Sequence, residues 1–259
     1  MSQASQVSQA STASTASTAT QQSAVPQAQP ASASPTIVLL MGAPGSGKGT
    51  QGRFLARHFN MPYLASGDLL RLAIEEQSEQ GRRVQAYVER GLYVPDELMV
   101  PMVMAELERH YRGRSRGVIL DGFPRTREQA VALDEALGAA GAAIRRVLFL
   151  YVPKDVLVSR LASRYTCRNC GATYNLLTKP PTRSGICDVC GHHPLYQRVD
   201  DQPDKVERRL SVDLEKAVPL AAYYHQHGIL CEVDGNRPAP EVTAALIAAV
   251  EGCRHGPPK

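Results

Sequence analysis

Short runs of hydrophobic residues alternate with longer stretches of helical periodicity along most of this chain. The short runs are rich in Val, Ile and Leu, which is typical of strands buried on both faces of a sheet. They lie at 37–41, 118–120, 147–152 and 229–233, with a weaker run at 63–65. The helical stretches between them lie at 48–59, 69–79, 83–90, 96–111, 127–137, 154–164, 203–227 and 239–251. This alternation predicts an α/β fold, a parallel five-stranded sheet with helices on both faces, which binds ligands at the carboxyl ends of its strands.

Residues 1–35 do not follow this pattern. They are mostly Ser, Ala, Thr, Gln and Pro, and they include no charged and no aromatic residue. Such a segment cannot bury enough apolar surface to offset the entropy lost on ordering, so we expect a disordered low-complexity tail at 1–35 and a folded domain at 36–259.

The composition narrows the possible functions. The 259 residues carry a net charge of +4, which is consistent with phosphate ligands but too weak to indicate nucleic-acid binding. The apolar runs, such as 37–41, are far shorter than the roughly 20 residues that a membrane-spanning helix needs, so we expect no membrane association. Six cysteines are too few for a disulfide scaffold of this length, so we expect a cytoplasmic protein in which cysteines are free to bind metal.

The strongest chemical motif follows the first predicted strand. Residues 42–50 read G-A-P-G-S-G-K-G-T and open a predicted helix, which is the context of a phosphate-binding loop. The glycines let backbone N–H groups converge on a phosphate, the helix N-terminus adds partial positive charge, and Lys48 can reach the β and γ phosphates. Because Gly49 stands where the general motif has Ser or Thr, direct coordination of Mg²⁺ by a hydroxyl there is disfavoured. The loop residues expected to contact ATP are Gly45, Ser46, Gly47, Lys48, Gly49 and Thr50.

Two C-x-x-C knuckles interrupt the later part of the chain. Cys167 with Cys170, and Cys187 with Cys190, form a pattern typical of a tetrahedral Zn²⁺ site in which four ligands exclude water, so we expect a structural metal. Iron and cobalt also accept thiolate ligands. A nucleic-acid-binding zinc ribbon is a weaker alternative, because the segment has few basic residues, and a redox pair is weaker still.

The phosphate loop resembles that of the nucleoside monophosphate kinases, and of the adenylate kinases above all. The likeness continues to the last predicted helix. S-G-D-L-L-R at 66–71 resembles the family's monophosphate-binding segment, D-G-F-P-R at 121–125 matches its acceptor-phosphate motif, and D-G-N-R-P at 234–238 matches its loop after the last strand. The cysteine insertion is similar to the zinc-bearing lid of many bacterial members.

The resemblance implies a reaction. A member of this family transfers the terminal phosphoryl group of MgATP to AMP and gives two ADP, by direct in-line transfer. We therefore expect ATP, AMP and ADP as partners, Mg²⁺ with ATP, a structural Zn²⁺, and a monomer. A kinase for UMP, CMP or GMP, and a nonenzymatic nucleotide- or RNA-binding module, are the alternatives.

The resemblance also implies the catalytic residues. Phosphoryl transfer depends on positioning and on neutralising charge, and the planar guanidinium of arginine grips phosphate oxygens in pairs. Six arginines are therefore expected at the phosphates, with Asp121 near Mg²⁺. The full catalytic set is Lys48, Asp121, Arg125, Arg160, Arg164, Arg198 and Arg209.

The remaining contacts divide between the two nucleotides. Beyond the phosphate loop, the implied ATP contacts are Arg160, Arg164, Thr173, Tyr174 and Arg237. The implied AMP contacts are Ser66, Arg71, Leu92, Tyr93, Val94, Gly122, Phe123, Pro124, Arg125, Gln129, Arg198 and Arg209. Residues 65–94 are expected to form a helical monophosphate-binding insertion and residues 163–201 a zinc-binding lid, and closure of both would exclude water.

Overall fold

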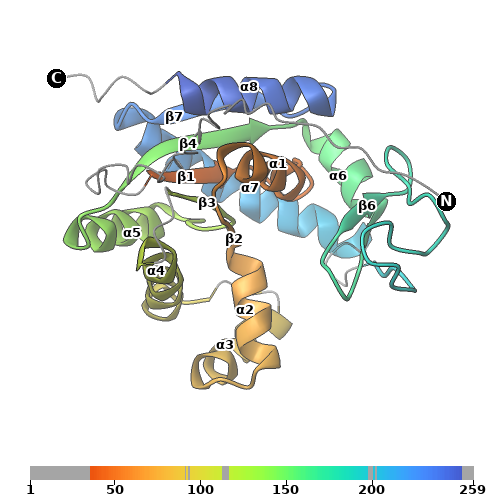
Figure 1. Ribbon diagram of the computed structural model, residues 1–259, viewed down its shortest axis with the longest axis horizontal. Helices are drawn as coiled ribbons and strands as arrows, with labels where there is room; N and C mark the ends of the chain where they lie inside the picture. Colours follow the sequence, from red (N-terminus) through yellow and green to blue (C-terminus); the bar gives the residue numbers. More distant parts are fainter. Residues whose placement is uncertain are drawn as a thin grey trace, which may run out of the picture. The chain divides into compact units, whose positions relative to one another are not determined.

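The protein is built around one parallel sheet. The computed structural model describes residues 36–90, 92, 94–112, 117–197, 201 and 203–252, so the predicted tail lies outside the described residues. The strands of the sheet run in the order β2-β3-β1-β4-β7, and every neighbouring pair is parallel (Figure 1). They are β1 (Thr36–Met41), β2 (Tyr63–Ala65), β3 (Gly117–Asp121), β4 (Ala143–Tyr151) and β7 (Leu230–Asp234). All five hydrophobic runs of the sequence are therefore strands.

The helices also follow the predicted order. They are α1 (Lys48–Phe59), α2 (Ser66–Glu75), α3 (Glu79–Glu89), α4 (Asp96–Arg112), α5 (Arg127–Ala139), α6 (Lys154–Ala162), α7 (Pro203–Gln226) and α8 (Ala239–Glu251). The largest shift is at α2, which begins and ends earlier than predicted. Gln77 takes a positive φ of 53°, and the Ser78 hydroxyl accepts a hydrogen bond from Gly81 N, so Ser78 caps α3 and cannot extend α2.

Helices cover both faces of the sheet, as the alternation predicts. Along β1, Ile37 and Leu39 pack into one buried cluster, which includes residues of α4, α5 and α7, while Val38 and Leu40 pack into another with residues of α1 and α8. Successive side chains of a strand point to opposite faces, so full burial of four consecutive residues requires both faces to be covered. Among the described residues, no helix is long and apolar enough to cross a membrane.

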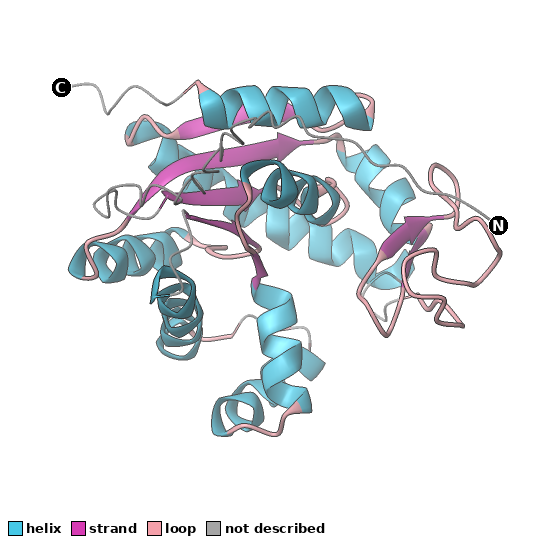
Figure 2. Cartoon of the chain, in the orientation of Figure 1, coloured by secondary structure: helices cyan, strands magenta, loops and turns pink. Residues whose placement is uncertain are grey.

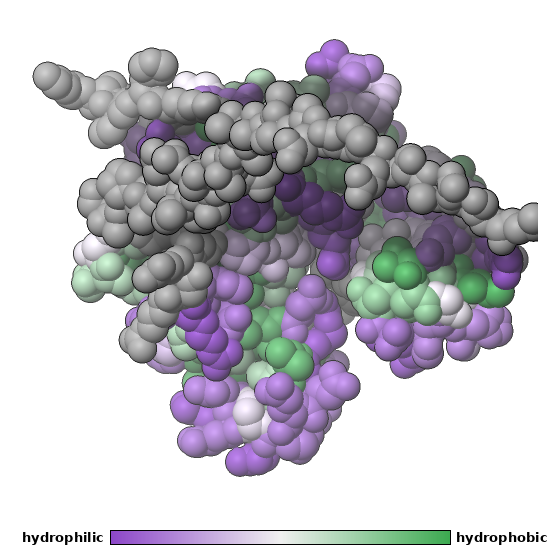
Figure 3. Space-filling view, viewed as in Figure 1, coloured by the Kyte–Doolittle hydropathy of each residue, from purple (hydrophilic) through white to green (hydrophobic). Residues whose placement is uncertain are grey.

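Two segments extend from this core. The first is the α2–α3 pair, whose far end carries mainly hydrophilic residues in Figure 3. The second is the lid segment, 164–196, which consists mostly of loops with one small antiparallel hairpin of β5 (Arg164–Thr166) and β6 (Thr173–Asn175) (Figure 2). The chain enters and leaves the lid segment at one point, because Thr166 and Tyr196 exchange two backbone hydrogen bonds of 2.8 and 3.0 Å. The predicted roles of 65–94 and 163–201 as mobile insertions remain predictions.

Candidate nucleotide site and metal centre

The phosphate loop lies directly between the carboxyl end of β1 and the start of α1. Gly42, Gly45 and Gly47 take positive φ angles of 135°, 84° and 99°, a region that strongly favours glycine. The loop is also tightly enclosed: a Cβ on Gly42 would come within 2.5 Å of Leu150 O, and one on Gly45 within 3.1 Å of Leu161 Cγ. Contacts with β4 and α6 therefore fix its path.

Two polar groups of the loop are placed to receive an anion. The Lys48 ammonium donates hydrogen bonds to Gly42 O at 2.7 Å and Ala43 O at 2.9 Å, so its charge lies over the loop itself. The Ser46 hydroxyl is buried, and the described part of the chain provides no hydrogen-bond partner for its oxygen. A buried hydroxyl without a partner is costly, and a phosphate oxygen would supply one.

The loop after β7 adjoins the phosphate loop. A Cβ on Gly235 would come within 3.2 Å of Ser46 O, and Arg160 of α6 donates a hydrogen bond to Gly235 O at 3.1 Å. Burial lowers the pKa of Arg160, while the nearby Asp234 acts in the opposite direction. Arg237 is more exposed and pairs with Glu241 at 3.0 Å. Arg160 is therefore held beside the phosphate loop. Arg237, in the loop after β7, lies closer to solvent.

A buried carboxylate ends the neighbouring strand. Asp121 is the last residue of β3, and its register partners are Leu40 in β1 and Ala65 in β2. The Tyr63 hydroxyl donates a hydrogen bond of 2.5 Å to Asp121 Oδ2. Burial, with Asp121 as the next largest cause, raises the pKa of Tyr63, so the phenol stays protonated.

The predicted acceptor residues meet just beyond Asp121. Ser66 is buried at the start of α2, and Gly122 takes a φ of 79°, where a Cβ would come within 2.8 Å of Ser66 Oγ. Arg125 is exposed, and its Nε donates a hydrogen bond of 2.8 Å to Gly122 O. Phe123 and Pro124 between them are buried. A hydroxyl and a guanidinium therefore both lie beside this turn, since the same Cβ on Gly122 would be 3.6 Å from Arg125 Nη2.

Gln129 supports that turn from α5. Its side-chain oxygen accepts a hydrogen bond from Arg125 N at 2.8 Å, and its amide nitrogen donates to Asp96 Oδ1 at 2.9 Å. The side chain is nearly fully buried. The amide nitrogen has a second proton, which is the group left for the predicted contact with an adenine edge.

The remaining acceptor residues differ in environment. Arg71 forms an ion pair with Asp68, one turn earlier on α2, and both side chains are about half exposed. Leu92 is exposed, whereas Val94 is buried in the core. Tyr93 lies outside the described residues.

Arg164, the first residue of the lid segment, is paired with Asp201, which follows the other end of the segment. Its guanidinium makes a two-point ion pair with Asp201, with Nε donating to Oδ2 at 2.7 Å and Nη2 donating to Oδ1. Asp201 is fully buried, so the pair is strongly constrained. Arg209 belongs to α7, and Arg198 lies outside the described residues.

The four predicted metal ligands come together within the lid segment. The Sγ atoms of Cys167, Cys170, Cys187 and Cys190 all lie within 4.8 Å of one another, and the 167–190 and 170–187 pairs are each 3.5 Å apart. A tetrahedral Zn²⁺ site with Zn–S bonds of about 2.3 Å separates its sulfurs by about 3.8 Å, so the donor set and spacing fit zinc.

Each knuckle closes through the glycine that follows it. Gly171 and Gly191 take φ angles of 67° and 71°. Their N–H groups donate to Cys167 O and Cys187 O at 3.0 and 2.8 Å. The backbone therefore folds back toward the cysteines, as the glycine after each second cysteine predicts.

Tyr174 has a different environment from the one expected. The sequence predicts contact with the ATP base, but the side chain is buried, accepts a hydrogen bond from Asp188 N at 2.7 Å, and lies 3.4 Å from Cys187 Sγ through its hydroxyl. The lid segment has few large apolar residues, and the ring of Tyr174 belongs with Leu195 to its small buried cluster. The adjacent Thr173 is exposed, and the expected contact of both residues with ATP remains a prediction.

The environment of Cys187 favours a thiolate. Burial alone raises the pKa of its thiol, but hydrogen bonds from the Tyr174 hydroxyl and from backbone amides outweigh burial and lower the pKa to about 6. A thiolate is the form that binds metal.

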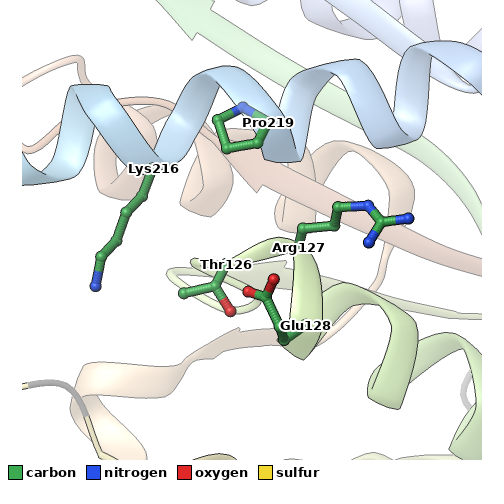
Figure 4. A pocket seen from close by; sticks show the side chains of 5 residues that line it. All are labelled: Thr126, Arg127, Glu128, Lys216 and Pro219. Carbon is green, nitrogen blue, oxygen red and sulfur yellow. The ribbon is translucent and has the colours of Figure 1, made fainter.

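A separate hollow of about 170 Å³ lies between the start of α5 and α7 (Figure 4). Its lining residues are Thr126, Arg127, Glu128, Lys216 and Pro219. None of these five is a predicted nucleotide or metal contact, so we assign the hollow no part in phosphate binding.

Sequence reasoning missed two partners in the site. Tyr63 reads as an ordinary strand residue, and only its place beside the end of β3 gives it a role. Asp201 lies in the predicted lid without a predicted role, whereas it is the buried partner of Arg164.

Comparisons with known proteins agree with these features. The adenylate kinase family model matches residues 40–229. An adenylate kinase of Enterococcus faecalis is 42% identical over 200 residues, which cover 77% of this chain and 92% of that protein. An adenylate kinase of Dehalococcoides mccartyi is 45% identical over 216 residues, which cover 83% and 97%. One of Staphylococcus aureus is 40% identical over 210 residues, which cover 81% and 96%. With its phosphate loop, acceptor turn and four-cysteine lid in place, this chain belongs to the adenylate kinase family.

Proposed function

We propose that this chain transfers the terminal phosphoryl group of MgATP to AMP, giving two ADP, by direct in-line transfer. The observation that carries the proposal is the pairing of β1 with β3. Leu40 is the register partner of Asp121, so the phosphate loop and the D-G-F-P-R turn leave the sheet side by side. A donor held by the first and an acceptor held by the second would bring their phosphates to one edge of the sheet.

The donor phosphates would bind in the phosphate loop. Lys48 would exchange its hydrogen bonds to the loop carbonyls for phosphate oxygens, and the Ser46 hydroxyl would gain a partner. Arg160, beside the loop, would add a second positive charge. Arg164 from the lid segment and Arg237 from the loop after β7 would add further positive charge. Thr173 and the backbone of Tyr174 would border the base.

The acceptor phosphate would bind between Ser66 and Arg125, with Arg71 released from Asp68 to join them. Gln129 would offer its second amide proton to the adenine edge. Arg198 and Arg209 complete the proposed set of charges, which neutralise the moving phosphoryl group in the transition state.

Mg²⁺, when bound, neutralises the β and γ phosphates. Asp121 fits this ion because it is a buried carboxylate at the same edge of the sheet as the loop. With Gly49 in place of a hydroxyl residue, we propose that Asp121 holds the ion through water.

The cysteine cluster would hold a structural Zn²⁺. All four ligands are protein thiolates, so a tetrahedral ion there has no position for water or substrate. A cluster of reduced cysteines agrees with a cytoplasmic location, and we propose that the enzyme acts as a monomer.

The test is a coupled assay of ADP formation from ATP and AMP, with and without Mg²⁺, on protein whose zinc content is known from elemental analysis. We expect rapid Mg²⁺-dependent ADP production and about one zinc per chain. Initial rates with CMP, UMP and GMP as acceptors provide the comparison. Equal or faster turnover of any of these would contradict the choice of AMP.

A further inference from the structure

Tyr63 joins three parts of the nucleotide site although it carries none of the recognised motifs. It is the first residue of β2, its ring lies against α1 just after the phosphate loop, and its hydroxyl reaches the end of β3.

The ring of Tyr63 occupies a notch in α1. A Cβ on Gly52 would come within 2.4 Å of Tyr63 Cε2, and a Cβ on Gly49 would lie 3.7 Å from the Tyr63 hydroxyl. The Arg53 guanidinium carbon lies 5.3 Å from the ring centre. Because Gly52 leaves room for the ring, packing against α1 restricts the position of the phenol independently of its hydrogen bond.

The hydrogen bond has a defined direction. Asp121, as a carboxylate, can only accept, and the phenol stays protonated, so the Tyr63 hydroxyl is the donor. The bond occupies Oδ2. It therefore restricts rotation of the carboxylate and leaves Oδ1 as the oxygen for a further ligand.

We propose that Tyr63 is a positioning residue for the metal step of the reaction: it holds Asp121 in the rotamer that receives a water of the Mg²⁺ bound to ATP. The inference rests on the proposed role of Asp121. Its chemical basis is that groups behind a metal-binding carboxylate set its orientation, and that their loss typically weakens metal binding by about 10-fold or more.

The chain offers a matched control for the loss of such a bond. Tyr223 of α7 donates a hydrogen bond of 2.7 Å to Asp134 Oδ2 of α5, and neither residue belongs to the proposed nucleotide site. Tyr63→Phe and Tyr223→Phe each delete one hydroxyl that bonds to an aspartate and each keep the ring.

Two readouts test the proposal on the full-length, zinc-loaded protein. The first is the Mg²⁺ dependence of ADP formation at fixed ATP and AMP. The second is Mn²⁺ binding to the complex with a nonhydrolysable ATP analogue, followed by electron paramagnetic resonance. Tyr63→Phe is expected to raise two quantities by about 10-fold: the Mg²⁺ concentration that gives half-maximal ADP formation, and the dissociation constant for Mn²⁺. It should leave the KM for AMP unchanged. Tyr223→Phe is expected to leave both metal readouts unchanged.

A double-mutant comparison separates this inference from the role of Asp121. Asp121→Asn is expected to weaken metal binding, and adding Tyr63→Phe to it should have little further effect, because the positioned carboxylate is already lost. If Asp121→Asn weakens metal binding and Tyr63→Phe does not, the positioning role is wrong and the role of Asp121 stands. If Asp121→Asn leaves the Mg²⁺ dependence unchanged, the proposed role of Asp121 fails and the inference fails with it. Loss of thermal stability by Tyr63→Phe with metal binding intact would assign the bond to folding alone.

Discussion

The phosphate loop and the lid segment hold loop structure in two different ways. The loop is wedged among β4, α6 and the turn after β7, and residues 37–40 of the strand that leads into it are fully buried. The lid segment has a small buried cluster in which two of the four buried residues, Cys167 and Cys187, are proposed metal ligands. Close packing therefore shapes the first region, and thiolate ligation is expected to shape the second. A small module cannot bury much apolar surface, so a bound metal would supply the stability that its core lacks.

The largest expected effect comes from removing charge where packing is tight. Lys48→Ala should lower the rate of transfer by about 1,000-fold, because the ammonium is the proposed contact with the β and γ phosphates. The fold should persist, since the hydrogen bonds of Lys48 to Gly42 O and Ala43 O lie within the loop itself. Steady-state rates and thermal unfolding measure the two effects, and near wild-type turnover would remove the role of Lys48.

The second prediction removes a metal ligand from the lid segment. Cys187→Ser should lower the zinc content well below one per chain and expose residues 164–196 to proteolysis, while the sheet still unfolds cooperatively. Elemental analysis and limited proteolysis give the readouts. Cys231→Ser in β7, outside the cysteine cluster, is the control and should keep its zinc. Unchanged metal content in Cys187→Ser would show that the comparison drawn above is wrong.

The smallest expected effect probes packing beside the loop. Gly52→Ala should lower the free energy of unfolding by about 1–3 kcal/mol, because the added methyl group meets the Tyr63 ring and Leu40. Gly138→Ala in α5 is the matched control. It has open space around the new Cβ and should raise stability by up to about 1 kcal/mol. Urea unfolding with zinc analysis tests both variants, and an undiminished free energy of unfolding in Gly52→Ala would show that the notch can relax.

The sequence was a good guide to the sheet because its signals there are strong and repeated. The central strands β1 and β3 are buried on both faces, and the five predicted runs are the five strands. The hairpin of β5 and β6 was not predicted, because its strands, R-Y-T and T-Y-N, are short and mostly polar. The cysteine spacing indicated a metal cluster without any need for regular secondary structure.

Within the site, motifs located the residues but not the directions of their side chains. The sequence placed Tyr174 in the lid segment and could not show that its phenol lies beside Cys187. Tyr63 gave no signal, because an aromatic residue in a strand usually belongs to the core. Its contact with Asp121 depends on how β2 and β3 align, which is a property of the assembled sheet.

The paired hydrogen bonds between Thr166 and Tyr196 have a consequence for protein engineering. They bring the two ends of a long excursion to adjacent positions, and the hairpin between them also bonds to the residues just before it, with Asn175 Nδ2 donating to Arg160 O and Leu176 N donating to Ser163 O. A module of different length or composition can be grafted there without stretching the sheet, provided that its own ends lie side by side, because lengthening a closed loop adds little entropic cost. The adjacent ends therefore allow the lid segment to be replaced as a unit.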